Sequence, residues 1–368
     1  MKMRRLQRRT KQSGVTLLEL LVVASIMLTL AAVSVPTIKP MMEAQQTSNA
    51  ASAVSTYLNR ARARAVTTGR PCGVMFEQFS GSSIDHDGDG TNDDGSVCLV
   101  LRQVEVPPYY TGLDYDTFVT VDSSNDGYLN GTIVRQVQYS DPYWGTFVSN
   151  ENNASIQFDN TGPFYPLVFD GGYSYIERLP GLELPSRLRV PFKVMRDPRP
   201  TMTAPIGLPS GTVVDLEWSG CGESESDLFS LGTSNSGDER NNNVIVMFAP
   251  SGEVEYVEDW NGRVEPTETL YFLVGRWDRA TILNLDLDAA DYYYDEYGEP
   301  VTLEDDGLWN YEDGTNFWVT INPQTGLVST VPVNPPTTYT GTGSQVIWQK
   351  IEESREFARE SKRNLGGR

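Results

Sequence analysis

The order of apolar and polar residues divides the chain into an N-terminal apolar run, a helical segment and a long strand-rich body. Residues 15–35 form the apolar run, and Glu19 is the only charged residue among these 21 positions. At ~1.5 Å per residue, a helix of this length spans ~31 Å, which is about the thickness of a bilayer core. We therefore predict a transmembrane helix at 15–35.

A basic leader precedes the apolar run. Residues 1–14 hold six basic side chains and no acidic one, and they end at Gly14. Because basic flanks stay cytoplasmic, we expect a single pass through the inner membrane with the C-terminal body in the periplasm. A secretory signal has a shorter apolar core and a small-residue cleavage site, whereas this run is long and Pro36 follows it. A plain signal anchor is an alternative, but it leaves Gly14 and Glu19 without a role.

The order of basic leader, Gly14, Val15, Glu19 and apolar run resembles the N-terminus of type IV prepilins, a family that includes the pseudopilins of type II secretion. The resemblance implies that prepilin peptidase cuts after Gly14 and that the new N-terminus at Val15 is methylated. It also implies that Glu19 acts in assembly. The family usually has Phe at the position of Val15, so the chain departs from the pattern there.

Elementary electrostatics supports the role that the resemblance gives to Glu19. A cut after Gly14 would leave an ammonium group on Val15, and both this group and the Glu19 carboxylate would lack solvation in lipid. Pairing them, within one subunit or between neighbours, lowers the cost of burying both. Between neighbours, the pair would also set the axial register of a filament.

Helical character continues beyond the apolar run, over residues 36–69. Pro36 and Pro40 predict a kink or short break there, because proline removes a helical hydrogen bond. Apolar residues then recur at helical spacing, and 68–71 supplies a stop signal. The apolar positions of this face are Val54, Leu58, Ala61 and Ala65.

Three further segments extend the resemblance to one class within this family. Residues 60–66, with Gly69, resemble the helix end of the GspH/FimT class of minor pseudopilins. Residues 248–254 resemble a Phe-x-Pro-x-Gly hairpin late in that domain, and 322–328 resemble its closing hairpin. The class implies a pilin-like fold with a long N-terminal helix packed on a β domain. A solvated basic face beside small packing residues is the alternative interpretation of 60–66.

The body at 70–343 is rich in short β-branched and aromatic runs separated by Gly, Pro, Asn and Asp, which predicts an antiparallel β domain and an α+β fold class. The acidic segments 107–131 and 277–314 are expected to be loop-like insertions. The predicted strands are 73–79, 97–106, 132–139, 155–158, 188–194, 212–218, 244–248, 253–257, 270–274 and 317–321.

The C-terminal segment 344–368 is charged and prone to form a helix. Ile347, Ile351 and Phe357 form a thin apolar stripe along it. The stripe predicts packing on the body or on a partner, and a frayed tail is the alternative.

The charge balance limits the partners of the body. The chain has 29 basic and 49 acidic residues, a formal net charge of −20, and loss of the six basic leader residues gives −26. Such acidity argues against binding to nucleic acid or to an anionic membrane surface.

The acidic loop at 85–95 is the one metal-like pattern. Asp85, Asp87, Asp89 and Asp93 stand at positions 1, 3, 5 and 9 of a calcium-type loop, and Gly90 provides its sharp turn. Position 12 lacks the usual bidentate Glu. The loop is therefore either a calcium site or a solvated acidic hairpin tip.

The chain has three cysteines and one histidine, which limits the disulfides and the catalytic sites that it could form. A Cys72–Cys98 disulfide would close a loop of about 26 residues and stabilise by roughly 3 kcal/mol, and three unpaired cysteines are the alternative. His86 is the single histidine of the chain, and we expect it to lie on the surface. Without a second histidine, no Ser-His-Asp triad can form elsewhere. No spacing favours a paired-acid hydrolase, so we expect no enzyme.

These observations favour a minor pseudopilin, a structural subunit of a type II secretion pseudopilus. Its expected partners are other pseudopilins, prepilin peptidase, the inner-membrane secretion platform and the membrane itself. A minor pilin of a type IV pilus or DNA-uptake system is a close alternative, because it shares the same helix chemistry. A membrane-anchored calcium-binding or adhesion module is the alternative from another class.

Overall fold

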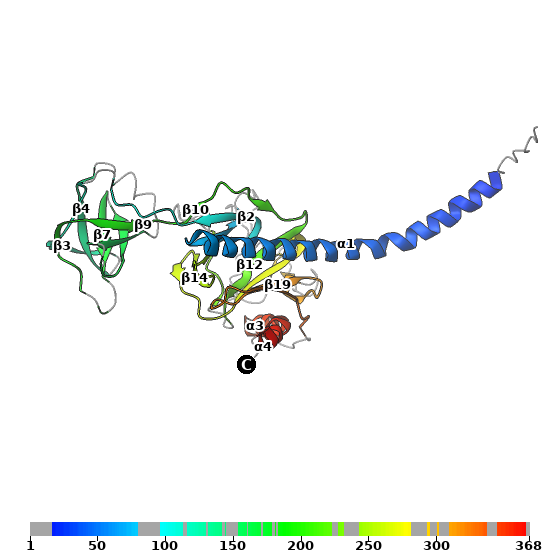
Figure 1. The fold of residues 1–368 in the computed structure, drawn as a ribbon. Helices are drawn as coiled ribbons and strands as arrows, with labels where there is room; N and C mark the ends of the chain where they lie inside the picture. The colour runs from blue at the N-terminus through cyan, green and yellow to red at the C-terminus, as the bar shows by residue number, and fades with distance from the viewer. Residues whose placement is uncertain are drawn as a thin grey trace, which may run out of the picture. The chain divides into compact units, whose positions relative to one another are not determined.

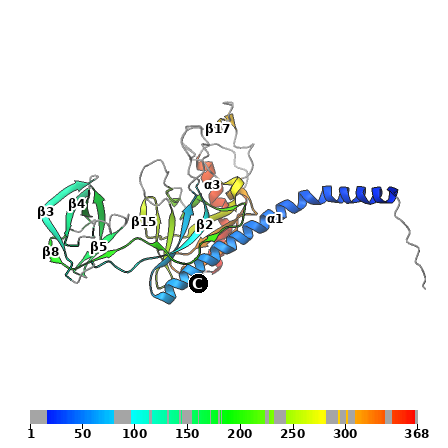
Figure 2. The same cartoon turned by 90° about the horizontal axis from the view of Figure 1, so that it is seen from above.

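The fold was obtained as a computed structural model, drawn in Figures 1 and 2. It describes residues 17–79, 96–112, 116–129, 132–141, 144, 154–159, 161–170, 172–178, 181, 183–222, 227–231, 243–280, 293–294, 300–301, 309–336 and 344–365. The side chains of Glu19 and of residues 29–40 lie outside this description. The chain divides into two units, Met1–Gln46 and Thr47–Arg368, and each is considered by itself.

A single long helix, α1, runs from Leu17 to Thr68 over 52 residues and is the blue helix of Figure 1. Of the kink or short break expected near Pro36, the break is absent, because the helix is unbroken through Pro36 and Pro40, and the kink stays a prediction. The two prolines stand four residues apart, so the N–H that Pro40 lacks would have bonded to the carbonyl of Pro36. Pro36 likewise cannot bond to the carbonyl of Ala32, so two bonds of the ladder are missing and the helix continues across both. Gly69, with φ 65°, then ends the helix as the sequence predicts.

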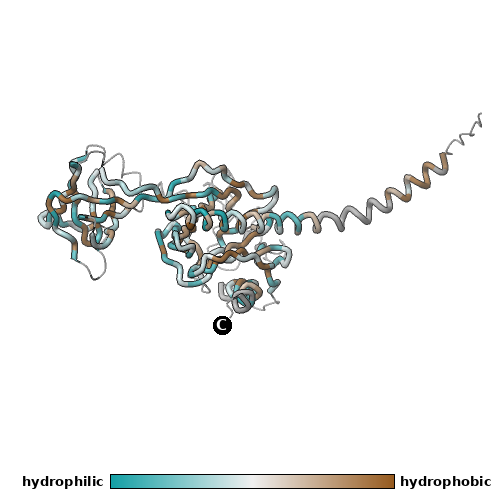
Figure 3. Tube along the Cα trace, in the orientation of Figure 1, coloured by the Kyte–Doolittle hydropathy of each residue, from teal (hydrophilic) through white to brown (hydrophobic). Residues whose placement is uncertain are grey.

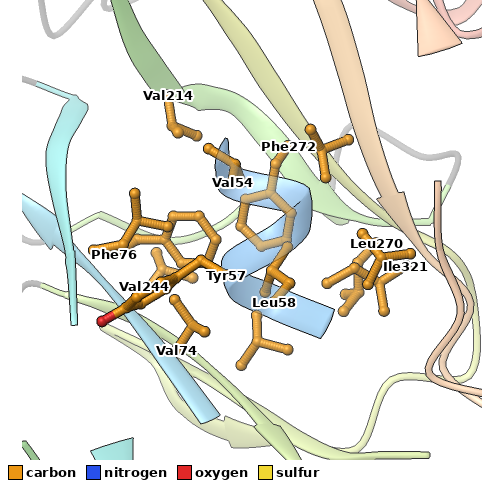
Figure 4. Packing of buried hydrophobic residues seen from close by; sticks show 14 of the residues in the cluster. Val54, Tyr57, Leu58, Val74, Phe76, Val214, Val244, Leu270, Phe272 and Ile321 are labelled. Atoms are coloured by element: carbon orange, nitrogen blue, oxygen red, sulfur yellow. The ribbon is translucent and has the colours of Figure 1, made fainter. Parts of the chain in front are cut away.

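In the second unit, the last part of α1 buries one face in the main hydrophobic core. Figure 4 shows Val54, Tyr57 and Leu58 among side chains from several strands, including Phe76 and Phe272. These two phenylalanine rings stack with centroids 4.3 Å apart and planes inclined by 6°. The buried positions of this face are Ala50, Ala51, Val54, Tyr57, Leu58, Ala61 and Ala65. Their spacing of three and four residues explains why one side of the helix is apolar.

The sheet beneath α1 is antiparallel and has the order β15-β14-β13-β1-β2-β12-β16-β19-β20, with the short β10 and β11 also paired to β2. Its strands are β1 Cys72–Gln78, β2 Val97–Glu105, β10 Arg199–Pro200, β11 Ile206–Gly207, β12 Thr212–Cys221, β13 Val244–Phe248, β14 Val254–Asp259, β15 Gly262–Val264, β16 Leu270–Arg276, β19 Phe317–Ile321 and β20 Val328–Pro332. The short elements outside this sheet are η3 Trp277–Arg279, η4 Asn310–Glu312 and a separate two-stranded pair, β17 Tyr293–Tyr294 and β18 Pro300–Val301.

Both faces of this sheet carry apolar side chains. In β16, Leu270 and Phe272 belong to the cluster under α1, whereas Tyr271 and Leu273 belong to a second cluster. Successive side chains of a strand point to opposite faces, so the second cluster lies on the face away from α1. Helices α3 Ser344–Ser354 and α4 Glu356–Leu365 cover that face, with Ile351 fully buried. The helical prediction for the C-terminal segment is confirmed, although Phe357 is exposed.

Arg355, at the junction of α3 and α4, fixes these helices to the sheet. Its guanidinium donates to the carbonyl oxygens of Trp218 at 2.9 Å and Gly222 at 3.1 Å. It also lies over three aromatic rings, those of Tyr271, Trp318 and Trp348, at 4.6, 4.8 and 5.4 Å. The side chain is 1% exposed. Carbonyl oxygens and ring faces together replace the water that this buried cation loses.

A second sheet is inserted between β2 and β12, with the order β8-β3-β4-β7-β6-β5-β9. Its strands are β3 Val119–Leu129, β4 Thr132–Tyr139, β5 Ser155–Phe158, β6 Tyr165–Asp170, β7 Tyr173–Glu177, β8 Arg187–Val190 and β9 Phe192–Met195. Strands β8 and β9 are separated by Pro191 alone, yet they occupy opposite ends of this order. One bent segment therefore closes the sheet into a small barrel.

The barrel has a core of its own, distinct from the clusters of the main sheet. Trp144, Ile156 and Ile176 are fully buried in it, and the Trp144 indole N–H donates to Ser174 Oγ at 2.8 Å. The segment 107–131 was expected to be an insertion made of loop, and that expectation is wrong, because Val119–Leu129 is a strand. The predicted strand 188–194 is split, since Pro191 has no N–H for a ladder.

The α+β class, with a long N-terminal helix and an antiparallel β body, is confirmed. Every other predicted strand is present within a few residues of its predicted bounds. The sequence missed β3, β6, β7 and several strands of two to five residues. Those runs are either interrupted by polar residues or too short to show alternation.

Truncating the α1 contact with the sheet should destabilise the body. Leu58 is fully buried, so Leu58→Ala should lower the free energy of unfolding by about 2–5 kcal/mol through lost burial and a residual cavity. Thr56→Ala, on the exposed side of the same helix, should change it by less than about 0.5 kcal/mol. Urea unfolding followed by tryptophan fluorescence measures both. Equal effects of the two variants would contradict this packing.

Candidate functional site

The first turns of α1 present exposed apolar side chains in the described part of the structure. Large apolar residues from Leu17 to Leu28 are 48% to 84% exposed, and they form the brown start of the helix in Figure 3. They are Leu17, Leu18, Leu20, Leu21, Val22, Val23, Ile26, Met27 and Leu28. An exposed apolar surface of this extent marks a place where a partner or a lipid phase takes the position of water.

The predicted processing and assembly residues lie at or before this surface. Gly14 and Val15 precede the described residues, as does the rest of the leader 1–14. Glu19 is the third residue of α1 as described, and its side chain lies outside the description. The pairing of Glu19 with the Val15 ammonium is therefore still a prediction. Among the described residues, no helix is both long and apolar enough to cross a membrane.

The far end of α1 meets two glycine turns. Arg62 Nε donates to the carbonyl oxygen of Gly252 at 2.9 Å. Gly252 and Gly326 have φ angles of 94° and 61°, and they belong to the two hairpins that the sequence singles out. A Cβ atom on Gly326 would lie 1.9 Å from Gly252 O and 2.9 Å from Arg62 Nε. Only glycine lets the two turns and the arginine approach this closely.

Two more α1 side chains tie the helix to β2 and to the segment that returns from the barrel. Tyr57 accepts a hydrogen bond from the Gln103 N–H at 3.1 Å and donates to Ala204 O at 3.3 Å. Burial raises the pKa of the Tyr57 phenol. Arg64 bonds to Glu105 at 2.9 Å and to Thr203 Oγ1 at 3.0 Å. The arginines of 60–66 are thus not all a solvated face, because Arg62 and Arg64 have specific partners.

A buried polar network, not foreseen from the sequence, joins η4 to the sheet. Asp215 is fully buried, and its Oδ2 accepts from Asn310 Nδ2 at 3.0 Å. Asn310 also accepts from the Arg276 N–H at 2.8 Å and donates to the Arg276 carbonyl at 3.0 Å. Desolvation raises the pKa of Asp215 from its ordinary 3.8 to about 7, and Glu217 adds to the shift. No sequence signal marked Asn310, which lies in the expected loop 277–314.

The proposed Cys72–Cys98 disulfide does not form, and Cys72, Cys98 and Cys221 are all free. In the β1–β2 pairing, Cys72 stands opposite Glu105 and Cys98 opposite Gln78. The two cysteines therefore lie at opposite ends of this strand pair, about 20 Å apart at ~3.4 Å per residue. A disulfide needs Cα atoms within about 7 Å.

The calcium prediction cannot be placed, because Asp85, Asp87, Asp89 and Asp93 lie outside the described residues, as does His86. Within the described part of the chain, no group of three or more His, Cys, Asp or Glu side chains could hold a metal ion.

Comparison with known families gives a match at the N-terminus. Residues 9–35 match the prokaryotic N-terminal methylation motif. This motif indicates a type IV pilin-like precursor. It suggests membrane anchoring, processing by prepilin peptidase and assembly with other pilins. The match contains Gly14, Val15 and Glu19 and stops before the β body. No curated protein matches the chain, and no solved structure matches it.

Substitution at the glycine turns tests the approach of α1. Gly162→Ala, at φ 84° with open space around it, should cost about 1 kcal/mol of unfolding free energy. Gly326→Ala, at a similar φ, should cost about 1–3 kcal/mol more, because its methyl group would overlap Gly252 O. Thermal unfolding of both variants measures the difference. Equal losses would mean that the turns do not approach as described.

The buried carboxyl of Asp215 should make stability depend on pH. The folded state holds the Asp215 proton more tightly than the unfolded state, so stability should fall as pH rises from about 4 through about 7. Between pH 5 and 8, Asp215 should account for a loss of about 2–3 kcal/mol. Asp215→Asn should abolish this part of the slope, whereas the exposed Asp116→Asn should keep it. Urea unfolding at both pH values is the measurement, and an unchanged slope in Asp215→Asn would contradict it.

Proposed function

We propose that the chain is a minor pseudopilin, a structural subunit of a type II secretion pseudopilus. It is made as a precursor, cut by prepilin peptidase after Gly14 and methylated on Val15. Its apolar helix anchors it in the inner membrane, and its β body lies in the periplasm. The match of residues 9–35 to the N-terminal methylation motif carries the proposal.

The difference in burial between the two ends of α1 supports an assembly role. The helix buries one face of residues 50–65 in the body, while Leu17–Leu28 remain exposed and apolar. A helix fixed at one end and uncovered at the other can pack against the same part of neighbouring subunits or lie in lipid. The Glu19 carboxylate, paired with the Val15 ammonium, would then set the axial register. The proposed role is structural and includes no catalysis.

The N-terminus of the mature protein tests the processing step. Intact-mass and N-terminal analysis of protein purified from membranes should show Val15, with one added methyl group, as the first residue. An intact Met1 would contradict the proposal and would favour a membrane-anchored module.

Replacing Glu19 tests the assembly step. Glu19→Ala should leave membrane insertion intact and should lower incorporation into filaments at least about tenfold, because the terminal amine loses its counter-charge in lipid. Glu43→Ala, which removes a carboxylate from the same helix outside the apolar run, should assemble normally. Cross-linking to co-expressed pseudopilins and sheared-filament blots measure incorporation. Normal assembly of Glu19→Ala would contradict the role, and incorporation only with pilus subunits would assign the chain to a type IV pilus.

A further inference from the structure

Exposed tyrosines gather on the inserted barrel and its entry. Among the tyrosines whose exposure the structure describes, Tyr109, Tyr128, Tyr139 and Tyr173 are the exposed ones, at 52%, 80%, 37% and 56%. All four belong to the barrel or its entry, and the described tyrosines of the main sheet and α1 are buried or half-buried. Exposed phenol rings leave apolar surface in water, so their gathering on one module points to a ligand.

Two tyrosines of β7 share one outer face of the barrel. Ser174 and Ile176 point into the barrel core, so Tyr173 and Tyr175 point outward. Side chains two apart on a strand lie about 6.6–6.8 Å apart on the same face. The two phenol groups therefore form a short row along β7, which lies beside β4 in Figure 1.

Strand pairing adds polar neighbours to this row. On β4, Gln136 stands opposite Tyr175. Gln138 lies two residues further along β4 and therefore points to the same side as Gln136. On β6, Asp170 stands opposite Tyr173 and Val168 opposite Tyr175. Directly opposed residues point to the same side of a sheet. We call these six residues the tyrosine face: Gln136, Gln138, Val168, Asp170, Tyr173 and Tyr175.

The hydrogen-bonding side chains of this face have no partner among the residues that the structure describes. The side chains of Gln136, Gln138, Tyr173 and Tyr175 make no hydrogen bond or ring contact with another residue that the structure describes. Each amide group can donate and accept hydrogen bonds, and so can each phenol hydroxyl. The face therefore combines flat apolar rings with free, mostly neutral, hydrogen-bonding groups.

The shape and charge of the barrel limit what it can bind. The bent β8–β9 segment closes the sheet, so this part of the barrel has no free edge for an added peptide strand. The chain has a formal net charge of −20, and Asp170 lies within the face, so a polyanion would be repelled. Val168 is the one aliphatic side chain of the face and is half-buried, so the apolar area of the face comes mainly from the two flat tyrosine rings.

We propose that the tyrosine face binds a neutral polysaccharide. The rings of Tyr173 and Tyr175 stack on the C–H faces of successive sugar units. The amides of Gln136 and Gln138 and the carboxylate of Asp170 hydrogen-bond the sugar hydroxyls. This binding role goes beyond the proposed pseudopilin role and does not depend on it.

Affinity electrophoresis in native gels tests the proposal. The full-length protein, in a detergent without a sugar head group, is run through gels containing hydroxyethylcellulose, galactomannan or xyloglucan, with alginate as the anionic comparison. Retardation by at least one neutral polymer, but not by alginate, is expected. Tyr173→Ala and Tyr175→Ala should each raise the apparent dissociation constant about tenfold, because each removes one aromatic stack.

Tyr128→Ala is the matched control. Tyr128 is 80% exposed and lies at the far end of the β3–β4 hairpin, opposite Ile133, outside the tyrosine face. This variant should bind as the unmodified protein does, and all three variants should keep the same melting temperature.

Four outcomes would overturn the proposal. They are no retardation by any neutral polymer, retardation by alginate alone, equal loss in Tyr128→Ala, and unchanged binding in Tyr173→Ala and Tyr175→Ala. Sedimentation of the same samples identifies the competing occupant. If Tyr173→Ala abolishes self-association while no polymer binds, the face is a contact between copies of the chain.

Discussion

The contact between the last part of α1 and the main sheet is the constraint on which the rest of this structure depends. Four of the seven buried residues on that helical face are alanines, which let the backbone of α1 come close to the strands. The large side chains of the core come from the sheet, where Phe76 and Phe272 stack beneath the helix. Hydrogen bonds then hold the helix on the sheet: Arg62 donates to the Gly252 carbonyl, and Arg64 donates to Glu105 and Thr203.

The last part of α1 is buried in the body, whereas the large apolar side chains of Leu17–Leu28 are exposed among the described residues. This separation is what a subunit of a helical assembly requires, since the exposed stretch must be available to neighbours or to lipid. The prokaryotic methylation motif occupies this same stretch and the leader before it. Sequence motif and exposed surface therefore point to the same functional end of the chain.

The barrel and the C-terminal helices both lie outside the face of the main sheet that α1 covers. The barrel leaves after β2 and returns before β12, and it buries its own core. The C-terminal helices cover the opposite face, where Arg355 replaces solvent with carbonyl oxygens and aromatic rings. Since the barrel closes on itself, it adds no unpaired strand edge to the described structure, and such edges promote unwanted pairing.

By itself, the sequence determined the features that depend on neighbouring residues. These are the prepilin-like N-terminus, the helix that ends at Gly69, most of the longer strands and the two glycine hairpins. Only the tertiary structure decided the closure of the barrel around Pro191, the burial of Arg355, the pairing of Asp215 with Asn310 and the separation of Cys72 from Cys98. Each of these joins or separates residues far apart in the chain, and their positions follow from strand order and register, which local patterns do not specify.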